Sequence, residues 1–145
     1  MKKLILFVCI CALLSCKKEK IEDVTKFNWV LKTATRTPGK MYNGKLETDY
    51  IESDPSTCLK NNYTIVFSNN GTYGYASNGP LCDLVANDNS LKWTKNGDQI
   101  TLINTRNNNS EINAKIEGTQ LTYTTTHNDN GTNYTIVWKF IAKSK

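Results

Sequence analysis

Cysteine and histidine are the most reactive side chains of this sequence, and they are few. The chain of 145 residues has five cysteines, at positions 9, 11, 16, 58 and 82, and one histidine, His127. His127 has no partner base or nucleophile near it in the sequence, so we expect a surface residue. The sequence contains no Gly-x-Ser-x-Gly motif, no His/Cys metal spacing and no phosphate-binding glycine loop. We therefore expect a non-enzymatic protein with no catalytic residues, metal site or cofactor.

Cys16 ends a short N-terminal segment that has the layout of an export signal. Lys2 and Lys3 precede an apolar run over residues 4–14, and Cys16 follows two residues later. The run is too short to span a membrane, which takes about 20 residues, and its charged start is typical of a secretory signal. Residues 13–16 (Leu-Leu-Ser-Cys) resemble the lipobox of bacterial lipoproteins. In that motif the thiol takes a diacylglyceryl group and the cysteine becomes the mature N-terminus.

The lipobox resemblance implies a division of the chain into three parts. Residues 1–15 are the expected signal peptide, 16–26 the lipidated N-terminus with a charged tether, and 27–145 one domain. It also implies a lipid-anchored protein of the bacterial cell envelope, at the outer membrane and facing the periplasm or the medium. Without residues 1–15, Lys+Arg falls from 18 to 16 against 13 acidic residues, a net charge near +3. These charges form no basic stripe, so we expect no binding to nucleic acid. We also expect a monomer that meets the membrane through its lipid.

Cys58 and Cys82 are the two cysteines that remain once the signal and the lipid site are set aside. An even pair in an exported protein predicts one disulfide. A metal site and two free thiols are the alternatives. A metal site needs more ligands than this pair, and His127 is the chain's one histidine.

Apolar residues alternate with polar ones along almost every segment from Phe27 onward, which predicts strands. The expected strands are separated by Asn-Gly turns, and one long polar connection is expected over 37–57. The strands are predicted over 27–31, 63–67, 72–75, 81–86, 91–95, 99–103, 112–116, 121–125 and 134–140. The short late connections predict an all-β fold, an antiparallel up-and-down meander of about eight strands. Closure into a barrel would remove its exposed edges.

The order of several short motifs resembles the lipocalin-like domain of small Bacteroidota lipoproteins. After the lipobox and tether come Phe27-Asn28-Trp29, Cys58 before the second strand, a strand and turn over 67–73, and Cys82. Leu91-Lys92-Trp93, the segment 97–102 and Leu121-Thr122-Tyr123 complete the pattern. The resemblance covers nearly all of residues 27–142. It implies a lipocalin-like (calycin-type) barrel, a Cys58–Cys82 bridge and carriage of a small hydrophobic molecule.

Aromatic residues at alternating strand positions are the candidate ligand-binding residues. In a hollow barrel they would form an apolar cup, with tyrosine hydroxyls to orient a polar group. The alternative is an ordinary packed core, in which case the barrel is a filled scaffold whose loops bind a protein or glycan. The candidates are Trp29, Tyr63, Phe67, Tyr73, Tyr75, Trp93, Tyr123 and Trp138.

The connection over 37–57 carries two further features. Glu47, Asp49, Glu52 and Asp54 form an acidic group, for which a solvated loop is favoured over a calcium site because the spacing of a calcium loop is missing. The aromatic and apolar residues of the same connection could instead lie across the barrel mouth as a lid. Those residues are Met41, Tyr42, Tyr50 and Ile51.

Overall fold

Antiparallel strands make up most of the part of the chain that the computed structural model describes, residues 23–78, 82 and 89–145. The predicted signal peptide, Cys16, most of the predicted tether and most of the strand expected over 81–86 lie outside these residues. The elements begin with a 3-10 helix, η1 (Val24–Lys26), followed by β1 (Phe27–Tyr42), β2 (Lys45–Asp49), the 3-10 helix η2 (Cys58–Lys60), β3 (Thr64–Phe67) and β4 (Tyr73–Ala76). The remaining strands are β5 (Leu91–Asn96), β6 (Gln99–Asn104), β7 (Ser110–Glu117), β8 (Gln120–Asp129) and β9 (Thr132–Ser144).

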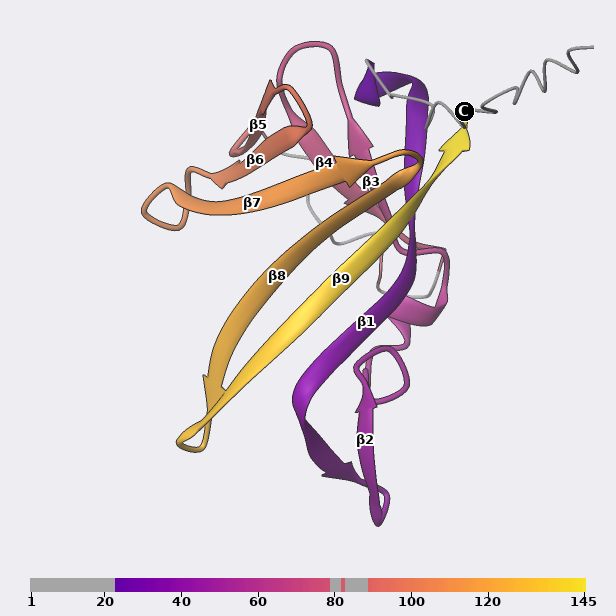
Figure 1. The fold of residues 1–145 in the computed structure, drawn as a ribbon, viewed down its shortest axis with the longest axis vertical. Helices are drawn as coiled ribbons and strands as arrows, with labels where there is room; N and C mark the ends of the chain where they lie inside the picture. Colours follow the sequence, from indigo (N-terminus) through magenta and orange to yellow (C-terminus); the bar gives the residue numbers. More distant parts are fainter. Residues whose placement is uncertain (1–22, 79–81, 83–88) are drawn as a thin grey trace, which may run out of the picture.

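Eight of these strands follow one another around a barrel in chain order, and β2 pairs alongside β1. The hydrogen-bonded order is β4-β3-β1-β9-β8-β7-β6-β5, so the first and last strands are neighbours inside the sheet (Figure 1). Between the outer strands, Thr72 and Lys92 form a single bridge, and the Trp93 amide donates to the Gly71 carbonyl at 2.9 Å. The predicted all-β up-and-down barrel is confirmed, with a closure of only a few contacts.

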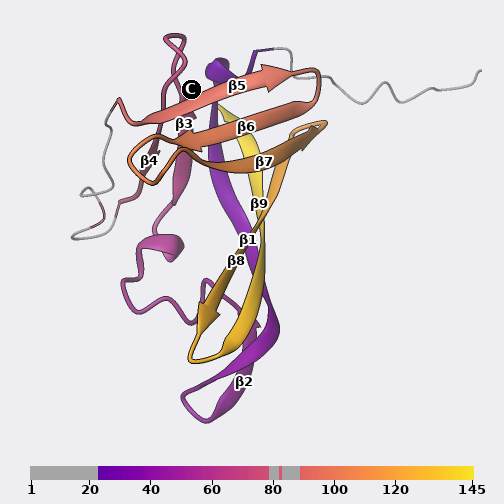
Figure 2. The ribbon, with the colours of Figure 1, turned by 90° about the vertical axis from the view of Figure 1, so that its left-hand side faces the viewer.

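The prediction of one long polar connection over 37–57 is wrong for its first part, which forms strand. β1 runs on to Tyr42, and β2 forms a hairpin with it that extends beyond the barrel (Figures 1 and 2). Two irregularities in the pairing of β1 explain why the sequence did not predict the second half of this strand. The pairing of β1 with β9 shifts between Leu31 and Thr33, so the buried positions change from odd-numbered to even-numbered residues. The pairing with β2 shifts between Thr35 and Lys40, where Pro38 needs no amide partner.

The turn between β8 and β9 has the backbone geometry that its Asn-Gly sequence predicts. Asn130 and Gly131 have positive φ angles of 50° and 81°. Such angles suit a tight hairpin turn, and asparagine and glycine tolerate them better than other residues. The two strands pair from Gln120↔Ile141 to Asp129↔Thr132, and they form a long arm directed away from the core (Figure 1).

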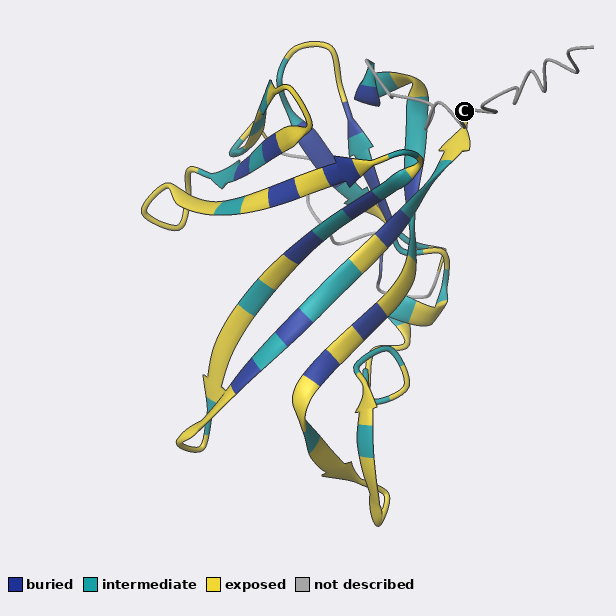
Figure 3. Cartoon of the chain, viewed as in Figure 1, coloured by how far each residue is buried: buried dark blue, intermediate teal, exposed yellow. Residues whose placement is uncertain are grey.

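The core occupies the end of the barrel where η1 and the last residues of β9 lie. Trp29, Phe67 and Phe140 are fully buried there, and buried positions alternate with less buried, mostly intermediate ones along parts of β8 and β9 (Figure 3). The helix η1 belongs to this core, since Val24 is 1% exposed and its carbonyl accepts a hydrogen bond from Trp29 Nε1 at 3.1 Å. Val24, expected in the last part of the tether, is therefore packed against the domain.

Candidate functional site

The eight aromatic residues proposed for ligand binding meet inside or against the core. Four belong to the buried cluster, namely Trp29, Phe67, Tyr73 and Tyr123, and four pack against it, namely Tyr63, Tyr75, Trp93 and Trp138. Tyr63 stacks on Tyr75 with ring centroids 5.3 Å apart, and Tyr123 stacks on Trp138 at 5.9 Å. These rings therefore pack against one another in and around the core.

Tyrosine hydroxyls enclosed in this packing are held in their neutral form. Burial raises the pKa of Tyr63, Tyr75 and Tyr123 well above the ordinary value for tyrosine, and it raises that of Tyr73 to a smaller degree. The cause is the loss of water around the charged phenolate. The group is therefore a polar but uncharged part of the core.

Cys58 and Cys82 form the predicted disulfide, with Cα atoms 5.5 Å apart. Cys58 begins η2, and Cys82 is fully buried. The bridge fixes η2 against the connection between β4 and β5. Ser77 strengthens the same region, since its hydroxyl lies 2.7 Å from the carbonyl oxygens of both Cys58 and Asn61 and donates its one proton between them.

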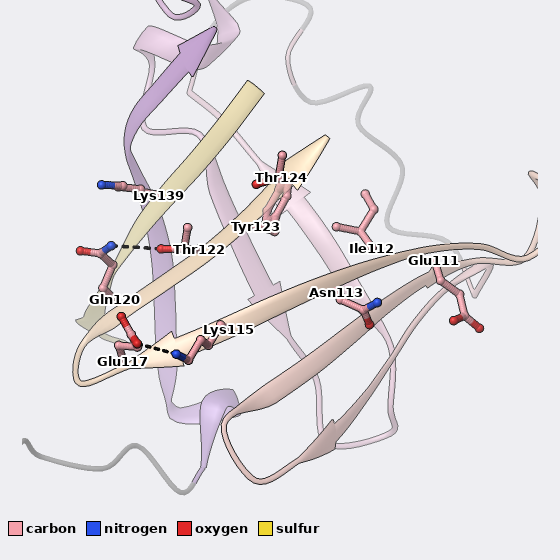
Figure 4. Close-up of a pocket in the computed structure, with 10 residues that line it drawn as sticks. All are labelled: Glu111, Ile112, Asn113, Lys115, Glu117, Gln120, Thr122, Tyr123, Thr124 and Lys139. Carbon is pink, nitrogen blue, oxygen red and sulfur yellow. Dashed lines mark hydrogen bonds and ion pairs between the residues drawn. The ribbon is translucent and has the colours of Figure 1, made fainter. Parts of the chain in front are cut away.

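A broad hollow of about 660 Å³ lies on the outer face of the sheet where β7 separates from β8. Most of its side chains are polar and point away from the core, as Lys115, Glu117 and Thr122 do (Figure 4). Lys115 pairs with Glu117 at 2.7 Å, and Gln120 donates to Thr122 at 3.0 Å. The hollow is open and four of its polar side chains are paired with each other, so it offers little to hold a small molecule.

A smaller cavity of about 340 Å³ lies at the other end of the inner face, under the β1–β2 hairpin. We call it the rim cavity. Its apolar and aromatic lining consists of Met41, Tyr42, Tyr50 and Pro55. Its polar lining consists of Arg36, Lys40, Ser53, His127 and Asp129. An apolar wall with a few convergent polar groups is typical of sites for small ligands, although this volume is near the lower limit of such sites.

Arg36 is the most enclosed charged residue at the rim cavity. It is 4% exposed, and its guanidinium carbon lies 5.6 Å from the ring centroids of both Tyr50 and Tyr134. Nη2 donates to the Glu47 carbonyl at 3.1 Å, whereas Nε is buried without a hydrogen-bond partner. Cation–π contacts stabilise a guanidinium in this position, but they do not satisfy the Nε–H group.

Lys40 and Asp129 form an ion pair at the mouth of the cavity. The hydrogen bond from Lys40 holds the pKa of Asp129 below its ordinary value, and the same bond raises the pKa of Lys40. The two charges therefore compensate each other across β1 and β8. His127 lies beside them with its ring stacked on Tyr134 at 5.4 Å, and it is exposed as expected.

Three of the four residues expected as a lid line this cavity, and Ile51 is not among the lining residues. Met41, Tyr42 and Tyr50 line it, and Tyr50 also packs edge-on against Trp138 with centroids 5.6 Å apart. Tyr50 is fixed by its amide, which donates to the Ala34 carbonyl at 2.8 Å. None of the eight aromatic ligand candidates is among the residues that line the cavity.

The acidic residues of the same connection are engaged in local structure. Glu52 pairs with Lys60 at 2.8 Å, and Asp54 accepts hydrogen bonds from Ser56 and from the Leu59 amide at 3.1 Å. Asp49 accepts from the Ile51 amide at 2.9 Å. Across residues 23–78, 82 and 89–145, no group of three or more His, Cys, Asp or Glu side chains is placed to hold a metal ion.

Sequence reasoning missed Arg36 and Lys40 as site residues. Both lie beyond the bulge in β1, where the alternation read from Trp29 assigns them to the wrong face. The signal that could have found Arg36 is its position two residues after the apolar Ala34, with which it shares a face of the strand.

Comparisons with known proteins leave the family open. No family model, no curated protein and no solved structure matches this chain. The resemblance to lipocalin-like lipoproteins therefore stays a prediction. In the part of the chain that the structure describes, no helix has the length and apolar character needed to cross a membrane.

Proposed function

We propose that this protein binds a small amphipathic molecule in the rim cavity. The observation that carries the proposal is the cavity itself, a concave space of about 340 Å³ with both an apolar wall and charged groups. The packed aromatic interior forms the floor behind Tyr50 and Trp138, so the ligand sits at the rim and not deep in the barrel. The protein acts in this proposal by binding and not by catalysis.

We further propose that the protein is a lipoprotein of the bacterial cell envelope, anchored through Cys16 at the outer membrane. The lipobox-like sequence before Cys16 and the Cys58–Cys82 disulfide support this location, because disulfides persist in oxidising compartments. The ligand would then be a molecule that the protein meets at a membrane face.

Fluorescent probes test the binding proposal. Anilinonaphthalene sulfonate and its uncharged analogue phenylnaphthylamine fluoresce when they enter an apolar site. We expect at least one of them to bind with one-to-one stoichiometry. Ser53→Phe places a ring in the rim cavity, so it should weaken that binding at least about tenfold, a loss of about 1.4 kcal/mol.

Thr126→Phe is the matched control, because it adds the same ring on the outer face of β8. It should leave probe affinity unchanged. Failure of both probes to bind, or binding that Ser53→Phe does not weaken, would contradict a ligand site in the rim cavity.

The second candidate is a filled scaffold that binds a protein or glycan through its loops. It is favoured by three large apolar side chains exposed on the β1–β2 hairpin: Met41 at 63%, Leu46 at 68% and Tyr42 at 39%. Exposed apolar groups of this kind are common at interaction sites. The same titrations separate the two candidates, since the scaffold requires no saturable binding of either probe.

A further inference from the structure

A buried positive charge without a counter-ion marks the inner wall of the rim cavity. Arg36 is 4% exposed, and within the described part of the chain no carboxylate forms an ion pair with it. Burial of a charge is costly unless the charge is paired and hydrogen-bonded. The contacts present are two tyrosine rings and one carbonyl oxygen, and Nε–H has no acceptor at all.

The other charges at the cavity do not supply the missing negative charge. Asp129 is the acidic residue of the lining, and it is already paired with Lys40. Glu47 contacts Arg36 only through its backbone carbonyl, while its carboxylate accepts from the Asp49 amide at 2.8 Å. The cavity therefore has an excess of one positive charge, located on Arg36.

We propose that the rim cavity selects ligands with a single oxyanion head group, such as a carboxylate, sulfonate or phosphate ester, and that Arg36 binds this head group. This inference rests on the proposed function, since it names the ligand class of the same site. A guanidinium presents planar donors that match an oxyanion, and charge-assisted hydrogen bonds are stronger than neutral ones. The apolar tail of the ligand would contact the wall formed by Met41, Tyr42 and Pro55.

The covering of Arg36 identifies the side chain that must move when a ligand binds. Nε is closed to solvent, and the Tyr50 ring lies over the guanidinium. Tyr50 follows the last residue of β2 and begins the loop that leads to η2. A displacement of the Tyr50 ring would expose the guanidinium while Tyr134 continues to support it from β9.

The test compares the two probes, which differ mainly by the sulfonate, in the purified protein. We expect anilinonaphthalene sulfonate to bind roughly ten to a hundred times more tightly than phenylnaphthylamine, as a hydrogen bond to a charged group would give. Arg36→Met keeps an unbranched side chain between the two tyrosines but removes the charge. This substitution should reduce the affinity ratio to about one, leave phenylnaphthylamine binding intact and not lower the thermal unfolding midpoint.

Arg106→Met is the matched control, since it removes a guanidinium from the turn between β6 and β7, outside the cavity. It should leave the ratio unchanged. The inference is overturned if the ratio is near one in the wild type, if Arg36→Met leaves it unchanged, or if Arg36→Met unfolds the protein or abolishes both affinities. In the last case Arg36 is a structural residue. Equal affinities that Ser53→Phe weakens would overturn the oxyanion preference and leave the proposed function standing.

Discussion

Tyrosine hydroxyls inside the barrel give the core a chemical property that an aliphatic core lacks. Tyr63, Tyr73, Tyr75 and Tyr123 are enclosed among other rings, and burial raises the pKa of each hydroxyl. In the unfolded chain each would ionise near pH 10. The folded state therefore holds these four protons more tightly than the unfolded state does.

This difference predicts how stability depends on alkaline pH. The pKa values of these four tyrosines are higher in the folded than in the unfolded state. Their contribution to stability is therefore fully present below about pH 10. It is lost as the pH rises above that value, because the tyrosines of the unfolded chain then ionise. Tyrosinate absorbance should show these four groups ionising later in the native protein than in denaturant. Tyr75→Phe should remove one late group. Native ionisation of Tyr63, Tyr73, Tyr75 and Tyr123 near pH 10 without unfolding would contradict the prediction.

Strands joined by short turns were predictable from the sequence because all the information needed is local. The β5–β6 pair has alternating side chains on both sides of Asn96-Gly97, and the β8–β9 pair turns at Asn130-Gly131. Glycine has positive φ angles in both turns, at 60° and 81°. Turn residues and period-two alternation therefore determined these elements and most of the core.

The β1–β2 hairpin and the rim cavity were not predictable in the same way. Exposed Met41 and Leu46 hide the usual alternation, and the shift near Lys32 exchanges the two faces of β1. The cavity also joins residues from β1, the loop after β2 and β8, far apart in sequence. Only the pairing of β1 with β9 and of β9 with β8 brings them together, and the sequence does not reveal that register.

The disulfide joins η2 to the connection between β4 and β5. Cys58 lies in η2 and Cys82 between β4 and β5, 24 residues apart in sequence. Replacing both with alanine should lower the free energy of unfolding by roughly 3–4 kcal/mol, because the unfolded chain regains the entropy of an open loop. Denaturant titration measures this loss. Reduction of the wild type should give a similar loss, and reducing agent should have no effect on the double variant. Equal stability of the oxidised wild type and the double variant would refute the prediction.

At the scale of the whole molecule, the start of the domain and the rim cavity lie at opposite ends of β1. The helix η1 precedes Phe27, whereas Arg36 lies further along the same strand, about 30 Å away at the usual rise of about 3.3 Å per residue. Figure 2 shows η1 and the β1–β2 hairpin at the two ends of the long axis. The start of the described chain at η1 therefore lies far from the rim cavity.

This separation makes the proposed lipid anchor and the proposed ligand site independent. Cys16→Ala removes the thiol that would carry the lipid, so we expect loss of metabolic labelling by palmitate and release of the protein from the membrane fraction. Probe affinity should stay unchanged, because η1 lies at the other end of β1 from the rim cavity. The Cys58→Ala/Cys82→Ala variant is the matched control and should keep the label. A Cys16→Ala protein that is still labelled and still bound to membranes would exclude this residue as the anchor.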